Sequence, residues 1–227
     1  MADPERTPDA DREWLVNQIA HALRNPIFAA SVQSEALQLR SYDPDAVVKA
    51  LDSMRGQLQR LSRTIDEMLL FGRPVRLNPE DVELAAVLDA LAARYRSGDR
   101  EAPADVSLAP VAPDLVGFWD RRIVVVIVER LLDNAVQHTE PPHRIELAAT
   151  ADGDDIAIVV RDRGRGIPPD ILERALLPFF PQHSGRAGLG LAVADKMARA
   201  HGGRIELASV EGEGTTARCV LPVRATA

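Results

Sequence analysis

Two residues near the N-terminus have side chains and a spacing suited to phosphoryl chemistry. His21 and Asn25 lie four residues apart in the segment from about Arg12 to Leu39, where apolar residues recur at helical spacing. On a helical wheel both lie opposite the apolar stripe, so both are expected to face solvent. A solvated imidazole is partly neutral at physiological pH, and its free ring nitrogen can attack a phosphoryl group. Taken alone, however, a residue such as His21 is more often a plain surface histidine.

Three later segments contain residues that can bind a nucleotide. Residues 162–167, with the sequence Asp-Arg-Gly-Arg-Gly-Ile, place two glycines beside the Asp162 carboxylate, which can accept an exocyclic amine such as that of adenine. Residues 185–191 open a predicted helix, whose free N–H groups favour phosphate. Asn134 lies within a predicted apolar helix, and its amide oxygen can ligate Mg²⁺ beside phosphate oxygens. Each segment alone also has an ordinary structural explanation, such as a tight turn at 162–167.

Two long helices are predicted to position His21. After the first, residues 41–44 have the composition of a turn, and Pro44 suits the first position of a second helix that continues to about residue 72. Apolar residues in this second helix repeat at alternating steps of three and four, which is typical of a coiled-coil seam. They are Leu51, Met54, Leu58, Leu61, Ile65 and Met68. Because one antiparallel hairpin cannot bury both of its apolar faces, two copies are expected to pair into a four-helix bundle.

The pattern changes to mixed α and β after the hairpin. Helices are predicted at 82–95, 121–138, 169–176 and 189–201, strands at 144–150, 155–162, 203–209 and 215–221, and a loop at 97–113. The predicted fold is therefore an α-helical hairpin followed by an α+β two-layer sandwich. The predicted domains are a flexible N-terminus at 1–11, the hairpin at 12–74 and the second domain at 78–224.

Composition narrows the class of protein. Of the 227 residues, 46% are hydrophobic and 27% are charged, so the chain is expected to fold. Its net charge of -7 argues against a nucleic-acid partner. Cys219 is the only cysteine, so neither an intramolecular disulfide nor a cysteine zinc site can form, and Cys219 is expected in a buried strand. No segment has the pattern of a signal peptide or membrane span, so a cytoplasmic location is expected; a removed upstream sensor stays an open possibility.

In this order the segments resemble the sensor histidine kinases of two-component systems, over roughly residues 12–223. Residues 21–26 resemble the phosphoacceptor box, 131–139 the asparagine box, 162–167 the first glycine box, 178–180 the phenylalanine box and 188–191 the second glycine box. Each motif is modest by itself. Their common order behind a heptad-patterned hairpin makes chance agreement very unlikely, although other ATPases share the fold of the second domain.

The resemblance implies a protein-histidine kinase with a Bergerat-type ATP-binding domain. Such an enzyme uses ATP and Mg²⁺ to phosphorylate His21 within a homodimer and passes the phosphoryl group to an aspartate of a response regulator. Asn25 matches a position that orients water to remove that phosphate again, and residues 178–187 match the nucleotide lid. The ATP-binding residues implied are Asn134, which also holds Mg²⁺, with His138, Asp162, Gly164, Gly166, Ile167, Gly188, Leu189 and Gly190.

Three features depart from the family pattern. Ala22 stands where relatives usually carry an acidic residue that acts as a base or fixes the imidazole tautomer. Arg130 and Gln137 stand where an amide or acid and a basic residue are common, and Arg130 can replace the charge lost at Gln137. The lid is short and contains His183 and Arg186 in place of a lysine.

These departures leave two alternatives beside a working kinase. One is a catalytically weakened dimeric docking or phosphatase protein of the same family, which Ala22, Arg130 and Gln137 favour and the complete glycine boxes oppose. The other is an ATPase that uses its second domain as a conformational clamp, with the hairpin as a tether. Phosphate on His21 would distinguish the kinase from the clamp.

Overall fold

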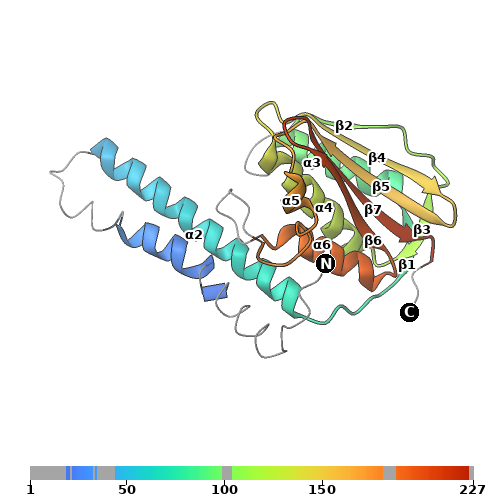
Figure 1. Ribbon diagram of the computed structural model, residues 1–227, viewed down its shortest axis with the longest axis horizontal. Coiled ribbons are helices and arrows are strands. Elements are labelled where there is room, and N and C mark those ends of the chain that lie inside the picture. Colours follow the sequence, from blue (N-terminus) through green and yellow to red (C-terminus); the bar gives the residue numbers. More distant parts are fainter. Residues whose placement is uncertain are drawn as a thin grey trace. The chain divides into compact units, whose positions relative to one another are not determined.

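The computed structural model describes residues 19–20, 22–32, 34, 44–98, 104–180 and 188–224. These residues form two compact units, which are shown in Figure 1. One contains the N-terminal helical residues and helix α2, together with Phe179, Phe180, Gly188 and Leu189. The other contains residues 73–178 and 190–224. Each unit is described by itself below.

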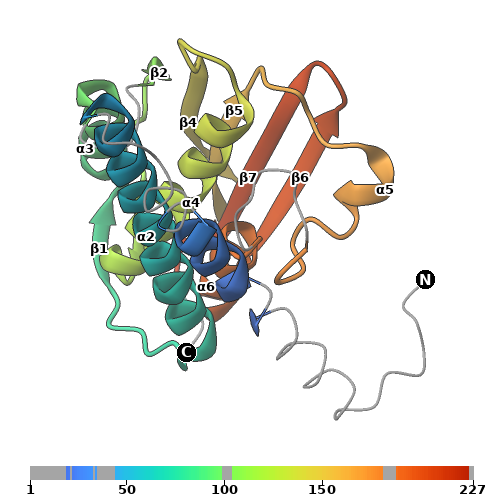
Figure 2. The ribbon, with the colours of Figure 1, turned by 90° about the vertical axis from the view of Figure 1, so that its left-hand side faces the viewer.

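The first unit is helical. Residues 22–32 are helical and lie beside α2 (Pro44–Gly72) in both ribbon views, as the predicted hairpin requires (Figures 1 and 2). Pro44 is the first residue of α2, as predicted, because a proline lacks only an N–H that the first helical turn cannot use. His21 and the predicted turn at 41–43 lie outside the described residues.

The second unit is built on a mixed five-stranded sheet in the order β2-β4-β5-β7-β6. The strands are β2 (Val106–Leu108), β4 (Ile145–Asp152), β5 (Asp155–Asp162), β6 (Arg204–Val210) and β7 (Gly214–Pro222). Only β2 is parallel to its neighbour, and the other pairs are antiparallel. A second sheet pairs β1 (Glu80–Glu83) with β3 (Val116–Trp119).

A layer of helices packs on one side of the five-stranded sheet, as Figure 2 shows. It consists of α3 (Leu84–Ser97), α4 (Arg121–His138) and α6 (Gly190–Ala200), while the short α5 (Pro169–Leu172) lies near β6. The core between the layers is largely aliphatic. Cys219 is buried in β7, as predicted, and burial raises the pKa of its thiol to about 12. The predicted two-layer α+β architecture is confirmed.

Several predicted elements differ in detail from the structure. The predicted helix at 82–95 begins only at Leu84, because Val82 pairs with Gly117 in the β1–β3 ladder. The predicted loop at 97–113 contains strand β2. The predicted helix at 169–176 ends at Leu172, and the chain continues in tighter turns, in which Arg174 N–H donates to the Ile171 carbonyl. In contrast, α4 and β5 have the predicted bounds.

Among the helices of the described residues, none combines the length and the apolar character needed to cross a bilayer.

Candidate functional site

Helix α4 carries two of the predicted site residues, one turn apart. Asp120 caps its first turn by accepting from the Arg122 N–H at 3.1 Å, and the Thr139 hydroxyl donates to the Ala135 carbonyl at 2.9 Å at its end. Because Asn134 and His138 are four residues apart, they lie on the same side of the last two turns of α4. Both side chains are half-buried there.

The start of α4 is tied to the end of α6 and to the connecting segment. Asp120 N–H donates to Nε2 of the fully buried His201 at 3.1 Å, and His201 Nδ1 donates to the Met197 carbonyl at 3.0 Å, so the imidazole is neutral with its proton on Nδ1. The Asp120 carboxylate also accepts from Asn78 N–H at 2.9 Å. Lys196 of α6 donates to the Arg73 carbonyl at 2.6 Å. Hydrogen bonds thus tie the start of α4 to the end of α6, and both helices to the segment that enters the unit.

Asp162, at the end of β5, is a buried carboxylate held by backbone donors. Asp162 is only 4% exposed. Its Oδ1 accepts from Gly164 N–H at 2.8 Å and from Thr215 N–H at 3.2 Å. Burial raises the pKa of Asp162, and the two backbone hydrogen bonds partly offset this rise. Because both donors go to Oδ1, Oδ2 is left to accept from the N–H of a ligand.

The glycines after Asp162 allow the chain to pack closely on itself. A Cβ atom on Gly164 would overlap the His138 carbonyl oxygen, and one on Gly166, whose φ is +67°, would overlap the Val210 carbonyl oxygen. From the sequence, these glycines were expected to allow a ligand to approach the backbone closely. The structure adds a packing reason, since they bring the loop against the end of α4 and the β6–β7 turn.

Arg165 links the same loop to His138. Its backbone N–H donates to the His138 carbonyl at 3.1 Å, and its guanidinium lies 2.7 Å from His138 Nδ1. A guanidinium only donates, so Nδ1 is the acceptor and the His138 proton lies on Nε2. Arg165 is exposed, as expected of a loop charge, yet it also sets the tautomer of a predicted site residue. Arg163, by contrast, pairs with Glu146 at the surface.

The contribution of the turn between β6 and β7 to the site was not expected from the sequence. A Cβ atom on Gly214, whose φ is +120°, would overlap the Asp162 carbonyl oxygen, and Thr215 N–H donates to the Asp162 side chain. The hydroxyl of Ser209, in β6, accepts from Ile167 N–H at 2.8 Å. The signal was present as the run Gly-Glu-Gly-Thr-Thr at 212–216, which begins between the predicted strands 203–209 and 215–221 and extends into the second.

The structure brings together some of the predicted site residues. One unit contains Asn134, His138, Asp162, Gly164, Gly166, Ile167 and Gly190. Within it, Gly164 lies against both the His138 carbonyl and the Asp162 side chain, whereas Gly166 lies against the Val210 carbonyl. Gly188 and Leu189 belong to the other unit, where Gly188 has φ +66° and accepts from Phe179 N–H at 3.1 Å. Asn25 is exposed, as predicted. His21, His183 and Arg186 lie outside the described residues.

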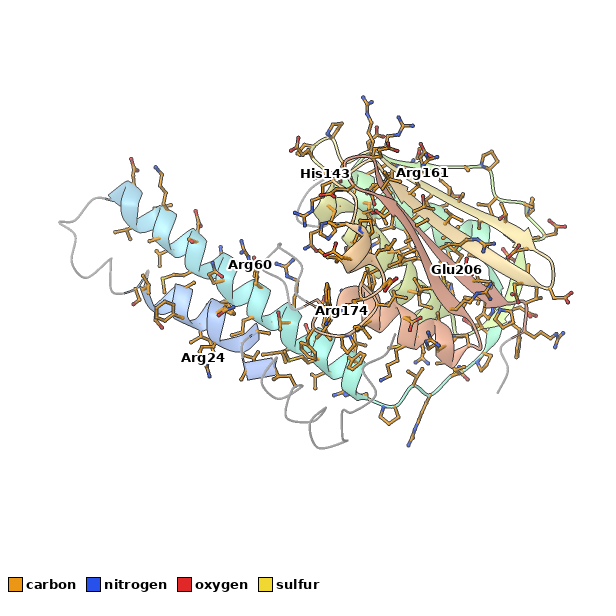
Figure 3. All side chains as sticks on the ribbon, viewed as in Figure 1. Arg24, Arg60, His143, Arg161, Arg174 and Glu206 are labelled. Atoms are coloured by element: carbon orange, nitrogen blue, oxygen red, sulfur yellow. The ribbon has the colours of Figure 1, made fainter. Side chains whose placement is uncertain are left out.

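The other charged clusters of this unit have structural partners. Glu206, labelled on β6 in Figure 3, accepts from Arg204 at 2.7 Å and Arg218 at 2.8 Å, and the two guanidiniums lower its pKa. Arg218 also pairs with Asp152 at 2.6 Å. Over the described ranges, no group of three or more His, Cys, Asp or Glu side chains is arranged to hold a metal ion. A metal at this site would therefore depend on Asn134 together with ligand oxygens.

Comparison with known proteins agrees with this arrangement. Residues 11–75 match the His Kinase A (phospho-acceptor) domain, and residues 119–225 match the ATPase family described as histidine kinase-, DNA gyrase B- and HSP90-like. The chain belongs to the sensor histidine kinases. The recognition made from the motif order is thereby confirmed, and the second unit is an ATP-binding domain.

Two curated relatives are similar to this chain over nearly all of its length. The adaptive-response sensory kinase SasA of Synechococcus elongatus is 32% identical, over 93% of this chain and 59% of its own length. The sensor protein QseC of Escherichia coli K12 is 31% identical, over 90% of this chain and 46% of its own length. The chain thus spans about half the length of the curated relatives it matches.

Solved histidine kinase structures share the fold. The histidine kinase ThkA, solved in complex with the response regulator TrrA, superposes with a TM-score of 0.78 at 22% identity, over 93% of this chain and 61% of that one. Full-length ShkA in complex with AMPPNP gives a TM-score of 0.65 at 22% identity, over 93% of this chain and 46% of that one.

Proposed function

We propose that this chain is the catalytic core of a homodimeric protein-histidine kinase. In this proposal the γ-phosphoryl group of ATP is transferred to His21 and then to an aspartate of a response regulator. The observation that carries the proposal is the buried Asp162 carboxylate, whose Oδ1 is held by two backbone N–H groups while Oδ2 remains to recognise a purine amine. The domain at 78–224 would bind the nucleotide, and the hairpin at 12–74 would carry the acceptor.

The residues of the ATP-binding unit suit the separate parts of a nucleotide. Asp162 would accept from the exocyclic amine of adenine, with the Gly164–Ile167 loop against the base. Gly190 begins the eleven-residue helix α6 and has open space where a side chain would be, so its end of the helix can receive phosphate oxygens. Gly188 and Leu189 precede that helix in the sequence, and by resemblance they would bind phosphate.

Asn134 fits the demands of Mg²⁺. This cation usually takes one or two protein oxygens, with phosphate oxygens and water completing six positions. A half-buried amide on α4, without a carboxylate cluster among the described residues, suits that pattern. When bound, Mg²⁺ supplies positive charge that neutralises the phosphates during transfer. His138, whose Nδ1 accepts from Arg165, would donate from its Nε2–H to the nucleotide.

The proposed reaction consists of two phosphoryl transfers. In the first, the bond between the γ-phosphorus and its bridging oxygen breaks, a phosphorus–nitrogen bond forms at His21, and ADP leaves. The imidazole proton must pass to a base, and Ala22 has no group that can accept it, so another group or water takes the proton. In the second, the phosphorus–nitrogen bond breaks and an aspartate oxygen of the regulator takes the phosphoryl group.

Exposed apolar residues on α2 support the homodimer. Leu51, Leu58 and Ile65 recur every seven residues and are 55%, 59% and 42% exposed in the single chain. Ile27 and Phe28 of the preceding helical segment are also exposed. Large apolar side chains left in water at heptad spacing are expected to be buried by a partner helix, which supports the four-helix bundle.

The partner proposed for the hairpin is a response regulator receiver domain. Asn25 is exposed on the helical segment that contains the acceptor region, where it can orient water against a partner's phosphoaspartate. The ThkA structure contains a response regulator, which supports this class of partner. The alternative of a weakened docking protein is not favoured, because the Asp162 site and its supporting loop are complete.

The test is phosphorylation of the intact chain with γ-labelled ATP and Mg²⁺. We expect acid-labile, base-stable label on the wild type and none on His21→Ala. Asn25→Ala is the matched control on the same helix face: it should keep the label and lose dephosphorylation of a phosphorylated receiver domain. Label that survives in His21→Ala, or ATP turnover that is independent of His21, would overturn the proposal in favour of an ATPase clamp.

A further inference from the structure

We propose that Ser209 is a positioning residue that aims Asp162 at the purine and thereby sets the preference for adenine over guanine. The inference rests on the proposed function, because it concerns the nucleotide that the kinase reaction consumes. Ser209 lies in β6, where it pairs with Thr215 of β7, the strand whose backbone holds Asp162. It was not among the residues that the motifs indicated. Its hydrogen bonds carry the argument.

The Ser209 hydroxyl uses all of its hydrogen-bonding capacity on three protein groups. It accepts from Ile167 N–H at 2.8 Å, donates to the Gly214 carbonyl at 2.9 Å and lies 2.9 Å from the Thr215 hydroxyl. A serine hydroxyl has one proton and two acceptor positions. Since the proton goes to Gly214 and one acceptor position to Ile167, the Thr215 hydroxyl must donate to the other.

These three bonds join the two segments that hold Asp162. Gly164 N–H, from the loop after β5, and Thr215 N–H, from the start of β7, both donate to Oδ1 of Asp162. Ile167 ends that loop, and Gly214 and Thr215 begin β7, so Ser209 sets the separation of the two donors. Because both donors hold Oδ1, they fix the rotation of the carboxylate about its Cβ–Cγ bond, and the planarity of the group then fixes the direction of Oδ2.

The direction of Oδ2 matters for choosing between purines. Adenine presents an amine donor where guanine presents a carbonyl acceptor. A rigidly held acceptor rewards the donor and repels the acceptor, whereas a carboxylate that can turn discriminates less. Ser209 itself has no hydrogen-bonding capacity left for a ligand. It therefore acts through Asp162, at the base and away from the phosphates.

The experiment compares Ser209→Ala with Ser107→Ala in the intact chain. Ser107 is a matched and demanding control, because its hydroxyl also donates from a strand to a backbone carbonyl, that of Ile145, which pairs with Asp162 in the β4–β5 ladder but does not hold the Asp162 carboxylate. Calorimetry with Mg-ATP and Mg-GTP measures each Kd, and labelling measures KM and kcat. For Ser209→Ala we expect Kd and KM for ATP to rise about tenfold, as for the loss of the one hydrogen bond between the adenine amine and the Asp162 carboxylate.

Further readouts separate positioning from general weakening. The ratio of GTP to ATP Kd should fall in Ser209→Ala, with kcat within about twofold of wild type. Ser209→Thr keeps the hydroxyl and should restore the ratio, and Ser107→Ala should leave it unchanged. If Ser209→Ala does not fold by circular dichroism, Thr215→Val decides: it keeps the N–H to Asp162 but removes the donor to Ser209, and the ratio should fall in it as well.

Each result distinguishes this inference from the kinase proposal. An unchanged ratio in a folded Ser209→Ala protein, or in Thr215→Val, would overturn the positioning role while leaving the kinase intact. An equal fall in Ser107→Ala would also overturn it, since any loosening of the sheet would then suffice. A wild-type chain that does not bind ATP would overturn the proposed function and this inference together.

Discussion

Helices α2 and α4 both have apolar residues at helical spacing, but only α4 buries them within the chain. Ile127, Val128 and Leu132 of α4 are fully buried against the sheet and neighbouring helices. On α2, Leu58 and Ile65 face solvent. The ATP-binding unit therefore contains the burial that stabilises it, whereas the exposed apolar residues of the hairpin would be buried only in the proposed dimer.

The largest effect on the free energy of unfolding of the ATP-binding unit is expected for Ile127→Ala. Removing three buried carbons from a closely packed core leaves a cavity, so the free energy of unfolding should fall by about 2–5 kcal/mol. Ile65→Ala makes the same change on α2, where the residue is 42% exposed and belongs to the other unit, and should cost the ATP-binding unit less than about 0.5 kcal/mol. Chemical denaturation followed by circular dichroism measures both. Equal losses would refute the comparison of the two helices.

Asp120→Asn should have the next largest effect, because it removes the charged cap of α4. Hydrogen bonds from Arg122 hold the pKa of Asp120 at about 2, below its ordinary value of 3.8. A depressed pKa contributes stability that is present above about pH 4 and is lost as pH falls towards 2. The variant should lose about 1–2 kcal/mol at neutral pH and flatten the stability profile between pH 4 and 2. Asp89→Asn, at an exposed site on α3, is the control.

Asp162→Asn should separate stability from function. Burial raises the pKa of Asp162, so its ionised form costs stability at neutral pH, and that cost disappears as pH falls through the raised pKa. The neutral amide should therefore leave the free energy of unfolding at pH 7 unchanged or higher. ATP affinity should fall at least about tenfold, since the amide NH₂ cannot accept from adenine. Thermal unfolding with and without ATP measures both, and a destabilised variant that still binds ATP would contradict the assignment.

The smallest effect on the ATP-binding unit is expected for Leu58→Glu, which should change its free energy of unfolding by less than about 0.5 kcal/mol. The same variant should convert the dimer to monomer at micromolar concentration, because it places a charge in the proposed apolar seam. Gln59→Glu, one residue along α2 and also exposed, is the matched control. Analytical ultracentrifugation measures the state. A dimer that persists in Leu58→Glu would place the interface elsewhere.

Local pattern was sufficient where an element is long and its neighbours in sequence decide its conformation. The bounds of α4 follow from the Asp120 cap and a continuous apolar face, and those of β5 from an unbroken apolar run. It was insufficient for β1 and β2, which are four and three residues long. Their backbone hydrogen bonds go to Val116–Trp119 and Ile145–Leu147, more than thirty residues away, and no local signal marks such pairing.

The candidate site divides in the same way. The motif order was enough to select Asp162, Asn134 and the glycines, but Ser209 and Thr215 were missed. Serine and threonine in strands are unremarkable by type, and Ser209 becomes significant only because the antiparallel pairing of β6 with β7 places it against Gly214 and Thr215. The Arg165–His138 contact was missed for the same reason, because it joins a loop to a helix 27 residues earlier.

The sequence by itself determined the family, the helical hairpin, the two-layer fold and the candidate chemistry, because these depend on residue type, periodicity and motif order along the chain. Only the tertiary structure decided which oxygen of Asp162 is held by the backbone, which tautomer His138 adopts and which residues brace the glycine loop. The physical reason is that hydrogen bonds depend on distance and direction between groups far apart in sequence, and these are set only when the sheet and its helices pack.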